Sequence, residues 1–180
     1  MKKFWTDLMC AAMTLSMAAC GSDSASAKND DKIYVGTEAG FAPYEYMSGD
    51  QVVGVDMDIA QAIADALGKE LVIKNMDFDG ALNAVQQGQV DFVAAGVSVD
   101  EERQKVMDFS HNYVDSSDVV IVNASADTVK TNEDIADKIV GVQQGNIADI
   151  WMTNNYPDAQ VKRYTKFVQA AEDLKNNKID

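Results

Sequence analysis

A chain of 180 residues, of which 47% are apolar, is long enough for one ordinary domain or two small lobes with a hydrophobic core. The formal net charge of −14 excludes nucleic acid as a natural partner, because binding to phosphates requires a basic face. The single histidine, His111, excludes metal sites built from several imidazoles. Cysteine occurs only at Cys10 and Cys20, so the folded part has no thiol for a disulfide, a nucleophile or a metal site, and we expect no cofactor.

The first twenty residues have the pattern of an export signal. Two lysines precede a mostly apolar run over residues 8–19, which is too short to span a bilayer. The run ends in "MAAC", which resembles a lipobox, so we expect residues 1–19 to be removed and Cys20 to carry lipid. Residues 20–31 are polar and would form a tether to the folded part. The alternative is a buried N-terminal helix with an incidental cysteine.

The first predicted strand, residues 32–36, alternates apolar and polar residues. Gly and Pro then punctuate a region of loop and short strands up to residue 54. A helix is predicted from residue 55 to Gly68, with Asp56 and Asp58 capping its free N–H groups. Its apolar stripe at i, i+4 and i+8 is expected to face the core. The stripe consists of Val55, Ile59, Ile63 and Leu67.

Strands and helices alternate through the remainder of the chain. A strand at 70–75 is followed by a helix that ends at Gly88 and by a buried strand within 90–96. Another buried strand, "DVVIVN", is predicted at 118–123, and strand, helix, strand and helix follow within residues 138–177. This alternation predicts an α/β fold with mostly parallel sheets.

A short internal echo suggests that the chain contains similar halves. "AVQQGQVD" at 84–91 and "DLKNNKID" at 173–180 both read as a helix end, a tight turn, and an apolar residue followed by Asp. By this echo Asp180 corresponds to Asp91, and we expect a strand to begin at Ile179.

Three stretches together carry a resemblance to a known family: "GTEAGFAPYEY" (36–46), "GVDMDIAQAIADAL" (54–67) and "AAGVSVDEERQKVMDFSHNY" (94–113). From residue 32 to 180 the chain resembles the extracellular solute-binding proteins that supply polar amino acids to bacterial ABC importers. The resemblance implies a periplasmic-binding-protein-like fold, with lobe 1 at 32–118 and an incomplete lobe 2 at 119–180. It also implies a monomeric, lipid-anchored protein outside the cytoplasm that binds a free amino acid and delivers it to permease subunits.

The third stretch contains the groups that a ligand carboxylate requires. Arg103 offers a planar fork, Ser98 offers a hydroxyl five residues earlier, and Gly96 allows the backbone to approach the ligand. The acidic residues around Arg103 suit the first turn of a helix. A surface arginine paired within that helix is the alternative.

Aromatic and acidic residues are expected to contact the rest of the ligand. Phe41 and Phe78 lie where the family carries aromatic walls, although plain core packing would explain either residue. Glu38 lies where the family often places a polar or acidic group, which favours a polar or cationic amino acid.

In the second half, "VGVQQGNIAD" resembles the loop that completes the carboxylate site in the family. Gln143, Gln144 and Asn146 lie in it, and Gln143 and Gln144 are candidate polar contacts, with a solvated loop as the alternative. Asn146 and Ile147 replace the usual Thr pair, so Asn146 can cap a helix while Ile147 cannot donate a hydrogen bond. The family's ammonium-binding acid would follow Asp180, together with the return crossover. We therefore expect this polypeptide to be a fragment that binds ligand weakly or not at all.

Two other functions are compatible with the same fold. A ligand-binding sensory module is the stronger alternative, and an enzyme resembling cyclohexadienyl dehydratase is the weaker one, because His111 has no evident catalytic partner. The residues do not identify which amino acid is bound.

Overall fold

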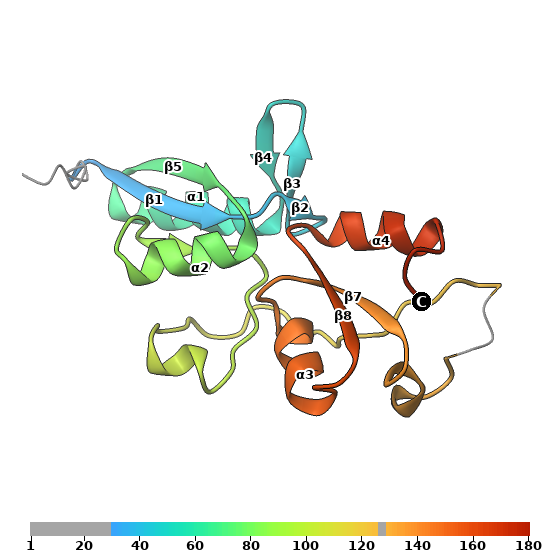
Figure 1. Ribbon diagram of the computed structural model, residues 1–180. Helices are drawn as coiled ribbons and strands as arrows, with labels where there is room; N and C mark the ends of the chain where they lie inside the picture. The colour runs from blue at the N-terminus through green and yellow to red at the C-terminus, as the bar shows by residue number, and fades with distance from the viewer. Residues whose placement is uncertain (1–29, 126–128) are drawn as a thin grey trace, which may run out of the picture.

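The computed structural model describes residues 30–125 and 129–180 (Figure 1). The predicted signal peptide, Cys20 and most of the predicted tether lie outside the described residues. Within the described ranges, no helix has both the length and the apolar character needed to cross a membrane.

The first half is built on a parallel sheet with the strand order β5-β1-β6. These strands are β1 (Lys32–Thr37), β5 (Glu70–Asn75) and β6 (Phe92–Val93). In the central strand, Val35 is fully buried and pairs with Ile73 on one side and Phe92 on the other. The chain crosses to β5 through α1 (Val55–Leu67) and returns to β6 through α2 (Phe78–Gln86). Right-handed crossovers in opposite directions place the two helices on opposite faces of the sheet (Figure 1).

Along the chain, a small antiparallel sheet lies between β1 and α1. It contains β2 (Gly40–Phe41), β3 (Glu45–Ser48) and β4 (Gln51–Val53), as the Gly- and Pro-rich sequence predicts. Gly54 then directs the chain into α1 with φ of 130°, and a Cβ there would lie 2.2 Å from the carbonyl oxygen of Tyr44. Only glycine fits this junction.

Helix α1 ends as predicted, at Gly68 in the left-handed conformation, but it buries a different face from the predicted one. Val55, Ile63 and Leu67 are exposed, whereas the core side consists of Asp56, Met57, Ala60 and Ala64. The small alanines let the helix backbone lie close to the sheet, which a stripe of branched side chains would prevent. The predicted capping by Asp56 and Asp58 is also wrong, because the helix has no side-chain cap.

Residues 94–125 connect the halves with almost no regular structure. The predicted helix around Arg103 is one short 3₁₀ turn, η1 (Arg103–Lys105), and a second turn, η2 (Asn132–Ile135), follows in the next segment. The predicted strand at 118–123 is not formed, and Val119 is 77% exposed. This segment lies along an apolar cavity of about 630 Å³ beside β7 and α4, and no strand among the described residues pairs with it. Without such a partner its backbone gains no ladder hydrogen bonds.

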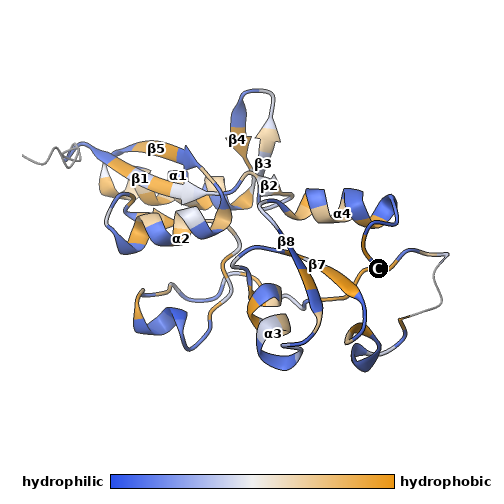
Figure 2. Cartoon of the chain, in the orientation of Figure 1, coloured by the Kyte–Doolittle hydropathy of each residue, from blue (hydrophilic) through white to orange (hydrophobic). Residues whose placement is uncertain are grey.

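The second half is a smaller parallel sheet of β7 (Ile139–Gln143) and β8 (Gln160–Tyr164). Helix α3 (Ile147–Asn155) connects the strands, and α4 (Phe167–Lys175) follows β8. Figure 2 shows apolar residues concentrated along β1 and β7, with hydrophilic C-terminal ends on α3 and α4. The main apolar cluster of this half contains Ile135, Val142 and Met152.

The sequence echo corresponds to a repeated structural unit. The N–H of Asp91 donates to the carbonyl of Tyr34 on β1, and the Asp91 carboxylate accepts from the Tyr34 N–H, both at 2.8 Å. Asp180 forms the same pair of bonds with Ile139 on β7, at 3.0 and 2.9 Å. The expected strand at Ile179 is represented by this contact alone, because neither residue is assigned to a strand.

Candidate functional site

The candidate site lies where the carboxyl ends of the strands in both halves meet. Glu38 follows β1, the segment from Ala94 follows β6, Gln144 follows β7 and Lys166 follows β8 shortly afterwards. Loops at the carboxyl ends of parallel strands are the usual location of ligand sites in α/β folds. The fold therefore brings the predicted ligand residues of both halves to one junction.

Arg103 is the central cation of this junction and is 6% exposed. Its Nη1 donates to the carbonyl of Ser98 at 2.6 Å, and its Nη2 donates across the junction to the carbonyl of Gly145 at 2.9 Å. Its Nε lies 3.1 Å from a carboxylate oxygen of Asp100. Burial lowers the pKa of Arg103, and the negative charge of Asp100 opposes that shift. The contact with Asp100 lacks hydrogen-bond geometry, so two of the five guanidinium N–H groups donate hydrogen bonds and three do not.

Phe78 belongs to the core, as the core-packing interpretation predicts, and its ring also contacts Arg103. Its role as an aromatic wall for the ligand stays a prediction. The guanidinium carbon lies 5.7 Å from the centre of the Phe78 ring, within the range of a cation–π contact. The same ring packs against Leu82 and Ala95 in the apolar cluster of the first half. The Phe78 ring therefore links the Arg103 guanidinium to the apolar core of the first half.

Glu38 is a buried carboxylate, 3% exposed, with partners from the second half. Gln143 Nε2 donates to Glu38 Oε2 at 3.1 Å, and Lys166 Nζ lies 3.3 Å from Oε1. The lysine contact is an ion pair without hydrogen-bond geometry, and Glu38 Oε1 therefore accepts no hydrogen bond. Sequence reasoning missed Lys166. The available signal was its position between β8 and α4, at the same edge as the other site residues.

Phe41 and Gly96 lie against each other on the first half. A Cβ on Gly96 would be 3.2 Å from the Phe41 ring, and Gly96 has φ of +55°, so a side chain is disfavoured there by both contact and conformation. Phe41 is 45% exposed and stacks on Tyr44 at 5.5 Å between ring centres. This half-exposed aromatic pair forms a wall beside the Arg103 loop.

The loop after β7 closes the junction from the other side. Gln144 Nε2 donates to a carboxylate oxygen of Asp79 at 2.8 Å. The Gly145 N–H donates to Asp149 at 3.0 Å. Asn146 is the N-cap of α3 and its side chain accepts from the Asp149 N–H at 3.0 Å, which confirms its predicted capping role.

The predicted residues are thus brought to one junction, although Ser98 contributes its backbone carbonyl to Arg103, whereas a hydroxyl contact with a ligand was expected. Asp100 and Asp79 are further partners that the sequence did not indicate. No group of His, Cys, Asp and Glu side chains within residues 30–125 and 129–180 is suited to hold a metal ion.

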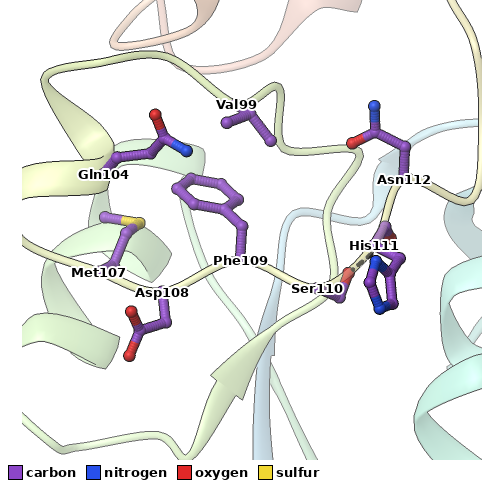
Figure 3. Close-up of a pocket in the computed structure, with 8 residues that line it drawn as sticks. All are labelled: Val99, Gln104, Met107, Asp108, Phe109, Ser110, His111 and Asn112. Carbon is purple, nitrogen blue, oxygen red and sulfur yellow. Dashed lines mark hydrogen bonds between the residues drawn. The ribbon is translucent and has the colours of Figure 1, made fainter.

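A cavity of about 700 Å³ lies on the loop that follows Arg103 (Figure 3). The ring of Phe109 lies among Val99, Gln104 and Met107, with Asp108 on one side and His111 on the other. The hydrogen bond drawn there joins Ser110 Oγ to the backbone carbonyl of His111 at 3.0 Å, so it does not orient the imidazole. None of the predicted ligand residues lines this cavity.

Comparisons with known proteins agree with the resemblance. The sequence profile of the bacterial extracellular solute-binding proteins, family 3, matches residues 33–179. The arginine-binding extracellular protein ArtP of Bacillus subtilis is 37% identical over 150 residues, which cover 83% of this chain and 58% of that protein. A probable histidine-binding protein of Campylobacter jejuni is 30% identical and is covered to 72% of its length.

The solved structures give the same picture. An ancestral arginine-binding protein bound to arginine matches with a TM-score of 0.78 and 37% identity, over 83% of this chain and 68% of that chain. Holo ArgBP from T. maritima matches with a TM-score of 0.79 and 37% identity, over 83% and 67% of the respective chains. These TM-scores show that the chain shares its α/β fold with both structures. The chain spans less than two thirds of the length of ArtP, 58%.

Proposed function

The chain belongs to family 3 of the bacterial extracellular solute-binding proteins, and we propose from this premise that it captures a cationic amino acid, with arginine as the preferred ligand, for an ABC importer. Residues 32–118 and 119–180 would act as the two lobes, with the ligand held at their junction. Several relatives are arginine-binding proteins by name, and none of those cited above is an enzyme.

The observation that carries the proposal is the buried carboxylate of Glu38. A buried carboxylate is costly unless cations or hydrogen-bond donors surround it, and Glu38 Oε1 has an ammonium nearby but no hydrogen bond. A guanidinium would offer several donors in one plane to such a group. A neutral amide side chain would offer an uncharged NH2 group only, and an acidic side chain would add a second negative charge.

The remaining residues have complementary roles in this proposal. Arg103 would direct the N–H groups that make no hydrogen bond in the structure to the ligand carboxylate. Phe41 and Phe78 would flank the apolar stem of the ligand, Gly96 would let it approach the backbone, and Ser98 would donate its hydroxyl. Gln144 and Asn146 would complete the site from the second half.

The cellular setting is part of the same proposal. The apolar run and Cys20 favour export and a lipid anchor at the outer side of the membrane, and residues 20–31 would hold the folded part within reach of the permease subunits. The protein would work as a monomer, because each chain carries its own ligand junction.

The test is titration calorimetry of the purified protein with L-arginine, L-glutamine and L-glutamate. We expect arginine to bind at least tenfold more tightly than glutamine, and glutamate to bind most weakly. Glu38→Gln should remove this preference by weakening arginine at least tenfold while changing glutamine little. Glu101→Gln, an exposed acid near Arg103, is the matched control. Equal affinities for the three amino acids would contradict the assignment of a cationic ligand.

A further inference from the structure

Asp56 is a fully buried acid that does not serve the helix on which it lies. It occupies the first turn of α1, where a carboxylate would ordinarily cap free N–H groups, but it makes no such bond. Its Oδ2 instead accepts the N–H of Gly96 at 2.9 Å. Both of its oxygens also accept from the hydroxyl of Tyr113, at 3.0 and 3.1 Å.

Gly96 and Tyr113 are the two ends of one segment. Between them lie Ser98 and Arg103, and the only regular structure in the segment is the short turn Arg103–Lys105. We propose that Asp56 is a positioning residue that ties both ends of segment 96–113 to α1 and thereby sets the place of Arg103 at the ligand junction. This inference rests on the proposed function for its consequence in binding, whereas the tie itself can be tested without a ligand.

The geometry at Gly96 shows why a carboxylate is suited to this task. Gly96 has a left-handed backbone, and the Phe41 ring lies 3.2 Å from where a Cβ would be. The segment therefore passes the aromatic pair with little space for a side chain. The N–H of Gly96 then points into the buried Asp56 side chain. Hydrogen bonds to a buried charge are stronger than neutral ones, and an unpaired carboxylate at this depth would be costly, so both donors are held firmly.

Glu45 adds a second buried acid to the same cluster. It is 1% exposed, and its Oε1 lies 4.0 Å from where a Cβ on Gly96 would be. Burial is the main cause that raises the pKa of Glu45 to about 9, and the charge and hydrogen bonding of Asp56 and the charge of Glu38 add to it. Tyr113 and Tyr44 are further titratable groups of this cluster. Burial is the main cause that raises the pKa of Tyr113, and the charge and hydrogen bonding of Asp56 add to it. At neutral pH, Glu45 is therefore protonated and adds no charge of its own beside Asp56.

The first experiment removes one end of the tie. Tyr113→Phe keeps the ring but loses the hydroxyl that donates to Asp56. Hydrogen exchange followed by mass spectrometry should show at least tenfold faster exchange in peptides covering residues 96–106, with unchanged exchange in β5 and α2. The affinity for arginine should fall about tenfold. Tyr46→Phe, which removes a hydroxyl from the partly exposed ring on β3, should change neither quantity.

The second experiment uses pH as a readout that loss of packing would not reproduce. As pH rises through about 9, Glu45 loses its proton and a second negative charge appears beside Asp56. Arginine affinity of the unsubstituted protein should therefore fall further between pH 8 and 10 than that of Glu45→Gln. Titration of the ligand's own ammonium is common to both proteins and cancels in the ratio of their affinities. A ratio that does not change with pH would count against the role of Glu45 in the cluster.

The outcomes separate the tie from the proposed function. Unchanged exchange in Tyr113→Phe would overturn the tie, and faster exchange with unchanged arginine affinity would overturn its positioning role. Faster exchange together with equal affinities for the three amino acids would support the tie and contradict the proposed function.

Discussion

Individual charged side chains at the junction show how far residue identity alone predicts a role. Arg103 and Glu38 were predicted as ligand residues, and both are buried at the junction. Their partners were not predicted, because Gly145 and Lys166 lie more than forty residues further along the chain and reach them only after folding. A sequence indicates the chemistry that a residue offers, while the opposing half decides which of its donors or acceptors stay free.

The protonated state of Glu45 gives a stability prediction at this scale. The folded pKa of about 9 lies above the ordinary value of 4.5, so between these values the folded protein holds a proton that the unfolded chain has lost. The free energy of unfolding should therefore decrease as pH rises through this window, by up to about 1.4 kcal/mol per pH unit.

Glu45→Gln should flatten this decrease, and urea unfolding at pH 5, 7 and 9 measures it. Glu70→Gln, an exposed acid on β5, should leave the pH dependence nearly unchanged. If Glu45→Gln and the unsubstituted protein lose stability in parallel, Glu45 is not the group responsible.

At the scale of elements, both halves contain a parallel strand, a helix, a second parallel strand and a second helix. They differ in how much space surrounds the glycine on the first strand. In each half a glycine on the first strand lies against an alanine of the second helix and against the apolar residue that precedes the closing Asp. These sets are Gly36, Ala81 and Val90 in the first half, and Gly141, Ala170 and Ile179 in the second. The shared spacing explains why the sequence echo between residues 84–91 and 173–180 was informative despite its shortness.

The two glycines differ in the space around them. A Cβ on Gly141 would lie 2.6 Å from Ile179 Cδ1 and 3.2 Å from both Ala170 Cβ and the Tyr164 ring. A Cβ on Gly36 would meet its nearest neighbours at 3.4 Å, an ordinary contact. We therefore expect Gly141→Ala to lower the free energy of unfolding by about 1–3 kcal/mol, as overpacking does, and Gly36→Ala to lower it by less than about 1 kcal/mol.

Urea denaturation of the two variants side by side provides the measurement, with each glycine as the control for the other. Equal losses in the free energy of unfolding would show that moving α4 away from β7 costs no more than moving α2 away from β1.

Elements were predicted well where local chemistry decides and poorly where tertiary context decides. Gly68 and Asn146 terminate and begin helices as expected, because both act through their own backbone or side chain. Helix α1 buries Ala60 and Ala64 in place of the predicted branched stripe, since the closeness of the sheet selects small residues. The strand predicted at 118–123 failed for the same type of reason: apolar composition does not supply a neighbouring strand.

The two halves of the molecule are held together by polar contacts that cross the junction. Lys166 approaches Glu38, Gln144 binds Asp79, and Arg103 binds the carbonyl of Gly145. The contacts of Glu38 with Lys166 and of Gln144 with Asp79 occupy groups that the proposed ligand would use, so ligand capture competes with these contacts. A substitution that weakens one of these contacts without removing a ligand contact should increase the affinity for arginine, because the ligand-free state that binding must displace is then less stable.

Lys166→Met tests this competition. Glu38 would lose its ammonium partner while Lys166, in this proposal, contributes nothing to arginine once the guanidinium has taken its place. We expect Lys166→Met to lower the free energy of unfolding of the ligand-free protein by about 1–3 kcal/mol, because a buried carboxylate is left with Gln143 alone. Arginine should then bind several-fold more tightly and raise the melting temperature by more than in the unsubstituted protein.

Lys175→Met, on the exposed end of α4, removes the same charge from the molecule without touching Glu38 and is the matched control. Thermal unfolding with and without arginine, together with calorimetry at two salt concentrations, distinguishes a local effect at Glu38 from a general change in net charge. Weaker arginine binding in Lys166→Met alone would show that Lys166 belongs to the ligand site, and that the contact between Lys166 and Glu38 supports capture where competition was expected.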